Sequence, residues 1–337
     1  MRRWILLTAV LPLLAAAPRP VPPRASSPSA AVGVYVTLAT VTGSSVERVA
    51  ADVRAAMAGA GWKVIADYDA GVNRQKCAFQ AHVFVADWPE FTRAAMRDSK
   101  LGAFAAQVRL SVFEDEDGVH VAMVNPRSIS RTVVAEQGRD EEWATFAAGI
   151  EKVLRAKLSG RTVEFGQRRD EGRIGKTMGV MAGGPFPGRV KEVYSAALAG
   201  ETFDSYTAAL YARLDKQKGD GEWRLRPVFL QMTSNPDVAV IGISSERVEA
   251  KSFDIVNTGG NGARDKMRCP GIDHAAAYPL ELVVVKDGGT VRVQVIDEMF
   301  RMKMYFEDAG MMAFMKNMGM PGSIGNELRQ KVRADAK

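Results

Sequence analysis

The chain contains one segment twice. Residues 108–124 form two apolar stretches around an acidic turn, and the same pattern returns without a gap 172 positions later, at residues 280–296. The apolar positions keep their phase, with Val108, Leu110 and Val112 in the first segment and Leu280, Leu282 and Val284 in the second. This alternation is typical of a β-hairpin with one buried face. The repeat therefore predicts that the chain folds as two copies of one unit.

A second repeated pattern lies upstream of the hairpin. Apolar residues with the spacing of an amphipathic helix begin at Val46 and recur 161 positions later from Thr207. Each predicted helix ends at glycines that lead into a strand, which begins with Trp62 in the first copy and with Trp223 in the second. The duplication thus includes a helix and a strand as well as the hairpin.

The details of the two copies differ. In the first copy Ser44 and Glu47 have the spacing of a capping box for the predicted helix. The offset between the copies grows from 161 to 172, so we place about eleven additional residues within 229–249, where they would form an extra strand. The offset of 161 also places the first strand of the second copy at 195–201.

The predicted elements of each copy define an α+β fold. In the first copy we expect strands at 32–39, 62–66 and 81–86, a hairpin at 107–124, and helices at 44–58, 89–97 and 140–158. Such an order favours helices packed on one face of a mostly antiparallel sheet. The expected division is a first repeat at 32–160, a linker with a helical segment at 161–200, and a second repeat at 201–337. The two copies are expected to pack as an internal pseudo-dimer.

The N-terminus has the pattern of an export signal. Arg2 and Arg3 precede an apolar run at 4–17, and a proline-rich spacer follows, so residues 1–25 are interpreted as a signal peptide and spacer. The run is too short for an ordinary membrane span. We therefore expect an exported protein, periplasmic or extracellular, with no stable membrane span after cleavage. A short N-terminal helix is the alternative.

Three sequence features resemble a known family, the bacterial and archaeal domain of unknown function numbered 302. They are the helix end at Gly59–Val64, the strand-to-helix junction at Val85–Phe91, and the Asp117-Gly118 turn of the hairpin. The family is a small α+β domain that also occurs as tandem pairs, so the resemblance implies a tandem repeat. Its members often have Cys-Asn-Pro where this chain has Asp87-Trp88-Pro89. The resemblance implies no activity and no catalytic residue.

The composition and motifs exclude several function classes. The net charge is +6, but the basic residues are interspersed with acidic ones and form no cluster with aromatics, so we expect no nucleic-acid partner. The chain has no nucleophile elbow, zinc-protease motif or dinucleotide-binding motif. His82 and His120 lie on predicted strands of one sheet, where they would serve a catalytic or metal site only if a carboxylate lies near them. An enzyme of unknown class is therefore the third hypothesis.

The two cysteines leave two interpretations open. Cys77 and Cys269 fall at positions that are not equivalent in the two copies. Export would permit a disulfide between them, which would join the copies. Alternatively, Cys269 lies close in sequence to His274, and a thiol and an imidazole together could contribute to a soft-metal site.

Methionines are concentrated near the C-terminus. Eight of the sixteen methionines fall within 299–320, and Met311, Met315 and Met318 share a helix face if Asp308 caps the segment 309–318. Methionine fills irregular cores and lines adaptable apolar grooves. Thioethers also bind Cu(I), and exposed methionines scavenge oxidants.

The sequence thus favours an exported, non-catalytic binding or interaction protein. The functional patch is expected in the Met-rich segment of the second repeat, with a protein or a small apolar ligand as partner and no required cofactor. The alternative is a soft-metal or redox-protective protein that holds Cu(I) with Met311, Met315, Met318, Cys269 and His274.

Overall fold

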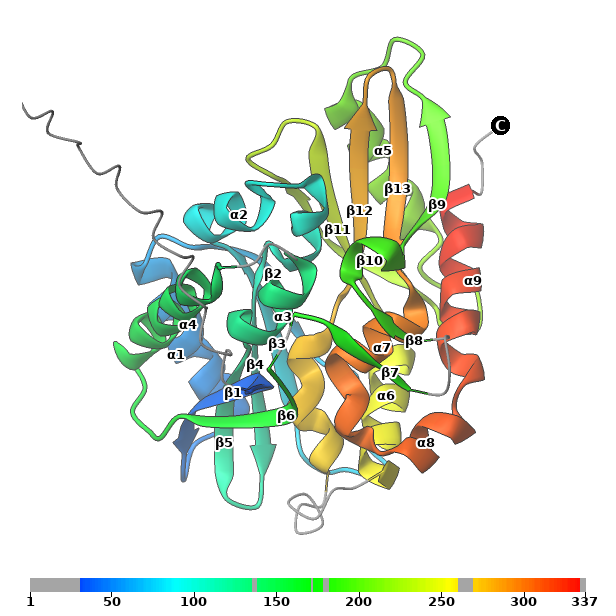
Figure 1. The fold of residues 1–337 in the computed structure, drawn as a ribbon. Helices are drawn as coiled ribbons and strands as arrows, with labels where there is room; N and C mark the ends of the chain where they lie inside the picture. Colours follow the sequence, from blue (N-terminus) through cyan, green and yellow to red (C-terminus); the bar gives the residue numbers. More distant parts are fainter. Residues whose placement is uncertain (1–30, 135–137, 171, 178–181, 260–268, 334–337) are drawn as a thin grey trace, which may run out of the picture.

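The computed structural model describes residues 31–134, 138–170, 172–177, 182–259 and 269–333. The segment interpreted as a signal peptide, residues 1–25, lies outside these ranges. Within them, no helix combines the length and apolar character needed to cross a bilayer. Figure 1 shows two units side by side, with the C-terminal helix at the outer edge of the second.

The first unit is an antiparallel sheet of six strands in the order β2-β3-β4-β5-β1-β6. The strands are β1 (Val32–Val41), β2 (Lys63–Asp69), β3 (Ala81–Asp87), β4 (Val108–Asp115), β5 (Gly118–Val124) and β6 (Val163–Arg169). The helices are α1 (Val46–Gly59), α2 (Pro89–Met96), η1 (Lys100–Ala105), α3 (Pro126–Val133) and α4 (Asp140–Arg155). Apolar residues of α1, α2 and α4 pack together with one face of this sheet.

The second unit is an antiparallel sheet of five strands in the order β10-β11-β12-β13-β9. Its strands are β9 (Val190–Ala197), β10 (Arg226–Met232), β11 (Val238–Ser244), β12 (Leu280–Asp287) and β13 (Thr290–Ile296). Its helices are α5 (Phe203–Lys216), α6 (Glu246–Gly259), η3 (Pro270–Ala277), α7 (Glu298–Phe306), η4 (Glu307–Ala309), α8 (Met311–Lys316) and α9 (Gly319–Arg333). The small β7 (Ile174–Thr177) and β8 (Ala182–Gly184) pair with each other, and η2 (Phe186–Arg189) leads into β9.

The two sheets confirm the α+β fold, and their arrangement is similar. Strands β1 to β5 and strands β9 to β13 occupy the same sheet positions in the same order. The predicted hairpins are β4–β5 and β12–β13, which keep the offset of 172 positions. Helices α1, α2, α3 and α4 therefore correspond to α5, α6, α7 and α9, whereas α8 has no counterpart among the described residues of the first unit.

The segment 161–200 differs from the linker expected there. It contains β6, which pairs with β1, and β9, which pairs with β13, so each end belongs to one of the sheets. Its helical content is the short η2. The first strand of the second copy is thus 190–197 and not 195–201. Most residues of β9 are exposed or half-buried, which explains why it lacks a clear apolar alternation.

Two further expectations are corrected by the structure. The strand at 238–244 is β11, the counterpart of β3, and is not an insertion; the second copy is longer between β11 and β12 instead. The N-cap of α1 is Ser45, whose side chain accepts a hydrogen bond from Arg48 N, because the helix begins one residue later than a Ser44 cap requires.

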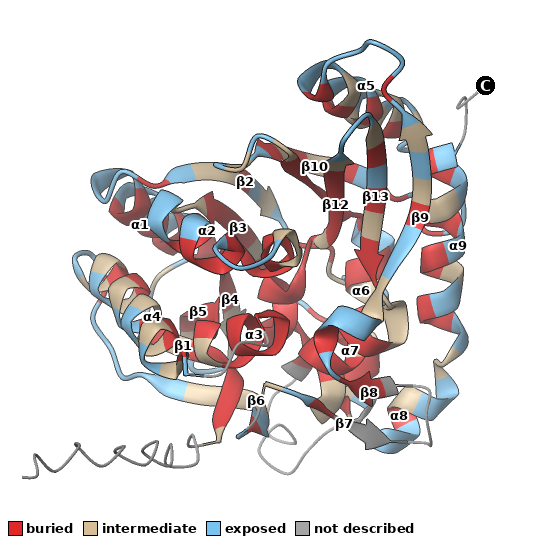
Figure 2. Cartoon of the chain, turned by 45° about the horizontal axis from the view of Figure 1, so that its top comes forward, coloured by how far each residue is buried: buried red, intermediate tan, exposed pale blue. Residues whose placement is uncertain are grey.

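The units pack against each other reciprocally. Segment η1 of the first unit contacts β11 and β12, and segment η3 of the second contacts β3 and β4. Segment η3 therefore covers a face of the first sheet that the alternation had predicted to be exposed, and β4 is buried on both faces from Val108 to Phe113 (Figure 2). One apolar core runs through both units. This is the arrangement of an internal pseudo-dimer.

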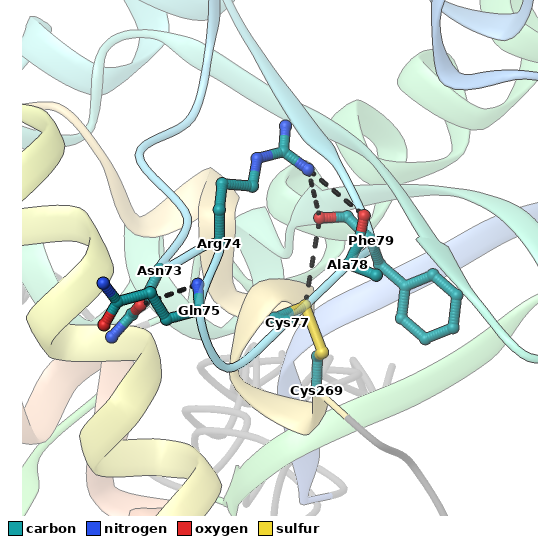
Figure 3. The surroundings of a disulfide bond; sticks show 7 residues. All are labelled: Asn73, Arg74, Gln75, Cys77, Ala78, Phe79 and Cys269. Atoms are coloured by element: carbon teal, nitrogen blue, oxygen red, sulfur yellow. Dashed lines mark hydrogen bonds between the residues drawn. A yellow bond between two sulfur atoms is a disulfide. The ribbon is translucent and has the colours of Figure 1, made fainter.

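A disulfide joins the units. Cys77 lies in the connection between β2 and β3, Cys269 directly precedes η3, and their Cα atoms are 5.7 Å apart (Figure 3). The loop around Cys77 is held by Arg74, whose guanidinium donates to the carbonyls of Ala78 at 3.2 Å and Phe79 at 3.0 Å. Of the two interpretations left open for the cysteines, the structure shows the disulfide.

Candidate binding pocket

The main pocket of the second unit lies between its sheet and its helices. Strands β12 and β13 form one wall, and α6, α7 and α9 form the others, with Phe314 of α8 at the edge. The pocket contains about 790 Å³ of empty space, counting its opening to solvent. Most of its lining is apolar; examples are Ile255, Val295, Met302, Phe306, Phe314 and Ile324. A mostly apolar lining with a few polar groups is typical of a site for a small molecule.

Two charged residues of the pocket lining, Glu281 and Arg301, are buried. Arg301 of α7 donates from Nε to Oε2 of Glu281 at 2.7 Å, and both residues line the pocket. Arg109 of the first unit reaches the other carboxylate oxygen of Glu281, with 2.5 Å between Nη2 and Oε1. Both guanidiniums also donate to the carbonyls of Ala277 and Pro279. We call Arg109, Glu281 and Arg301 the buried charge cluster.

This cluster has an excess positive charge. Burial raises the pKa of Glu281, but Arg109 and Arg301 outweigh it and bring the pKa below its usual range. Burial lowers the pKa of Arg301, but Glu281 outweighs it and raises the pKa above its usual range. Glu281 is therefore a carboxylate at neutral pH, opposite the guanidiniums of Arg109 and Arg301.

Arg301 has hydrogen-bonding capacity that the protein does not use. Its guanidinium lies over the ring of Tyr305, 4.6 Å from the centroid, and 5.9 Å from the centroid of Tyr278. Its Nε and Nη2 have the partners described above, whereas Nη1 has none among the described residues. The residue is only 6% exposed. A guanidinium has five N–H donors, and a buried donor is normally paired.

A hydroxyl pair lies in the same lining. The Ser252 and Tyr278 hydroxyls are 2.6 Å apart and form a hydrogen bond, and both residues are buried. Burial raises the pKa of Tyr278, so its phenol stays protonated at neutral pH. The pair has two O–H groups and uses one in the mutual bond. The second O–H has no acceptor among the described residues.

The first unit has a smaller pocket at the equivalent place. Its empty space is about 300 Å³. The two linings share seven equivalent positions, which are Val108, Arg109, Val124, Pro126, Ile129, Ser130 and Ile150 in the first unit and Leu280, Glu281, Ile296, Glu298, Arg301, Met302 and Leu328 in the second. Arg301 thus replaces an isoleucine of the first unit.

Aromatic rings explain the difference in size. In the first unit Trp143 and Phe146 of α4 pack edge-on against Phe91 of α2, with ring centroids 6.3 and 5.1 Å from the Phe91 centroid. At the corresponding positions of α9 the second unit has Pro321 and Ile324, which line the large pocket. Smaller side chains at these positions leave the space empty.

The Met-rich segment borders the pocket and is largely exposed. Met311 and Met315 of α8 are 61% and 46% exposed, and Met318 is half-buried. Helix α8 spans 311–316, and its N-cap residue is Gly310. Asp308 therefore does not cap this helix as expected, and its carboxylate contacts His274 instead. Figure 2 shows α8 at the surface beside the buried α7.

The other predicted ligands of the soft-metal site are otherwise engaged. Cys269 has no thiol, because its sulfur is in the disulfide. His274 is fully buried, and its two ring nitrogens contact carboxylates of Asp273 and Asp308. These two residues therefore do not join Met311, Met315 and Met318 in a site. In the described part of the chain, no group of three or more His, Cys, Asp or Glu side chains is arranged to hold a metal.

His82 and His120 do not form a shared site. His82 lies between Asp67 and Asp69, with nitrogen–oxygen distances of 2.6 and 2.7 Å. His120 has its own carboxylate, Asp115, at 2.7 Å, and contacts Thr40 through its other nitrogen. Each histidine thus has separate partners, and the pair gives no support to an enzyme.

The geometry defines a two-unit α+β protein whose second unit has the larger of two equivalent pockets. Residues 38–157, most of the first unit, match the family described as domain of unknown function DUF302. A crystal structure of an uncharacterized conserved DUF302 protein from Bacillus stearothermophilus is 17% identical, with 37% of this chain and 95% of that chain covered, at a TM-score of 0.29. No curated protein matches the chain.

Sequence reasoning missed the pocket, although two signals of it were present. Glu281 is an acidic residue within the apolar stretch of β12, and Arg301 follows Phe300 in a helix rich in methionine and aromatic residues. Charged residues within apolar elements are buried only when they are paired. Opposite charges at two such places predict a buried ion pair, which is what the structure contains.

Proposed function

We propose that the protein is a non-catalytic binding protein that takes a small apolar ligand into the pocket of the second unit. The main support is the contrast between the units, since one fold has its cavity packed with aromatic rings in the first copy and open in the second. The adjoining α8 exposes methionines, which adapt to the shape of a ligand. The same exposed side chains also suit a protein partner.

The proposal extends to the origin and location of the protein. We infer that the second unit is a diverged copy of the family domain matched by the first, because both sheets have the same strand order. Export is supported by the basic and apolar N-terminal sequence and by the disulfide, since such bonds persist in oxidising compartments.

Binding of a neutral apolar fluorophore, N-phenyl-1-naphthylamine, tests the proposed function. Its fluorescence should rise and saturate with the wild-type protein. The double variant Ile255→Phe/Ile324→Phe fills the pocket and should weaken binding at least about tenfold, because apolar contacts need the empty space. Met232→Phe places the same ring on β10, where the native side chain is 40% exposed, and should leave binding unchanged.

Two results would contradict this proposal. One is a wild-type protein that gives no saturable signal, and the other is equal affinity of the filled variant and the wild type. Far-ultraviolet circular dichroism and thermal melting of all three proteins establish that each is folded.

The alternative function, Cu(I) binding, rests on Met311 and Met315, which α8 exposes one turn apart. Replacing Met311, Met315 and Met318 by leucine removes three thioether donors and costs less than about 1.5 kcal/mol per residue, because volume and polarity barely change. A competition with a Cu(I) chelator under reducing conditions measures whether these methionines bind Cu(I). Equal Cu(I) retention by wild type and triple variant excludes these methionines as the site.

A further inference from the structure

We infer that the ligand of this pocket is a single-chain apolar carboxylate, a fatty-acid-like molecule whose head group binds Arg301 and the Ser252–Tyr278 pair. This inference rests on the proposed binding function and specifies the ligand class. An apolar lining alone would accept any hydrophobic molecule. The polar groups of the lining select among them, because a few placed polar groups set the specificity of such sites.

The first argument is the unused donors. Nη1 of Arg301 and one O–H of the Ser252–Tyr278 pair have no acceptor among the described residues, although all three residues are at least nine-tenths buried. All three residues line the pocket, so an acceptor of a bound ligand can reach these donors. A carboxylate has two acceptor oxygens and accepts from both kinds of donor. An alcohol or a hydrocarbon cannot form charge-assisted hydrogen bonds with both the guanidinium and the hydroxyl donor.

The second argument is the charge balance. The buried charge cluster has two guanidiniums and one carboxylate, hence one excess positive charge. Glu298, the other carboxylate in the lining, contacts Lys191 at 2.7 Å and Arg329 at 3.0 Å and so is already paired. A monoanion beside Arg301 would neutralise the excess, whereas a cation would increase it.

The third argument is the comparison between the units. The equivalent of Arg301 is Ile129 and the equivalent of Ser252 is Ala95, so the first unit has neither donor. Its pocket is also the smaller one. The open space and the polar head-group site thus occur together in the second unit.

Competition against the bound neutral fluorophore tests the inference. Dodecanoate and 1-dodecanol have the same chain and differ in the head group, and dodecyltrimethylammonium has the opposite charge. With wild-type protein, dodecanoate should displace N-phenyl-1-naphthylamine at a concentration at least about tenfold lower than dodecanol, and dodecyltrimethylammonium should be the weakest competitor. Equal potency of dodecanoate and dodecanol would overturn the inference.

Variants assign the effect to the named residues. Arg301→Met should lose the preference for dodecanoate over dodecanol, and Arg301→Lys should restore part of that preference. Because Arg301→Met disturbs the buried charge cluster, Ser252→Ala/Tyr278→Phe serves as the milder variant, with an expected threefold to tenfold loss of preference. An unchanged preference in folded variants contradicts the assignment. Absence of fluorophore binding in wild type would instead contradict the proposed function itself.

Discussion

Two buried glutamates show how single contacts decide the state of a carboxyl group. Glu249 accepts hydrogen bonds from Gly71 N and from the hydroxyls of Tyr68 and Ser244, and burial raises its pKa despite these neutral donors. Burial acts on Glu281 in the same direction, but two guanidiniums outweigh it and lower its pKa. Of these two glutamates, Glu281 is therefore the one that the fold holds as a carboxylate.

Replacement of Glu281 by glutamine should destabilise the protein strongly. The glutamine amide cannot compensate Arg109 and Arg301, and removing one partner of a buried ion pair costs about 3–5 kcal/mol. Urea unfolding at pH 7 measures the change. Asp69→Asn is a suitable control, because the Asp69 side chain is 86% exposed. A loss below about 1 kcal/mol for Glu281→Gln would contradict the importance of the cluster.

The same carboxylate should make stability depend on pH. The pKa of Glu281 is lower in the folded protein than the usual value of about 4.3 expected in the unfolded chain, so the folded state favours the ionised form. Its stabilising contribution is complete above that unfolded value and is lost as the pH falls through the folded pKa. The difference in unfolding free energy between wild type and Glu281→Gln should therefore shrink below about pH 4. A difference that stays constant from pH 7 to pH 3 would exclude this linkage.

At the scale of elements, the units differ in how the helix equivalent to α4 is packed. Trp143 is 1% exposed, and its ring lies edge-on to Phe91 and 4.5 Å under the guanidinium of Arg139. In the second unit α9 packs through aliphatic side chains such as Leu328 and Val332 and also makes polar contacts. Glu327 accepts from Trp223 N at 2.7 Å and from Leu225 N at 2.8 Å. Backbone hydrogen bonds thus fix α9 without filling the space beneath it.

Trp143→Ala should open a cavity in the first unit and cost about 3–5 kcal/mol of unfolding free energy. The matched change in the second unit is Phe314→Ala at the edge of the pocket, where the ring is half-buried and borders space that is already empty. It should cost about 1 kcal/mol, because little packing is lost. Chemical denaturation of both variants provides the comparison, and equal losses would show that aromatic filling does not distinguish the units.

Some elements could be predicted from the sequence because their pattern is local. The sequence predicts the hairpin β12–β13 because its apolar positions keep the phase of those in β4–β5. β9 could not be predicted, because an exposed edge strand has few apolar residues to show the period of two. The pocket could not be predicted either, because its lining comes from seven elements whose packing against each other is not a local property of the sequence.

At the scale of the molecule, equivalent positions of the two units contact each other. Arg109 and Glu281 are 172 positions apart, the offset of the hairpin repeat, and they meet across the junction of the units. A residue close to a two-fold axis contacts its own copy, and two arginines there would repel each other. Because the two units are parts of one chain, they can carry different residues at this position, and Arg109 in the first unit faces Glu281 in the second.

The disulfide makes the two units depend on each other, and its loss should lower the stability of the whole chain. Cys77 and Cys269 are 192 residues apart in sequence, so the bond removes much conformational freedom from the unfolded chain and contributes about 2–5 kcal/mol. Cys77→Ser/Cys269→Ser should therefore melt at a lower temperature than the oxidised wild type, with one transition because one apolar core spans both units. Dithiothreitol should lower the melting temperature of the wild type and leave that of the double variant unchanged. Two reactive thiols per denatured, unreduced wild-type chain would show that the bond does not form, and two separate transitions would show that the units unfold independently.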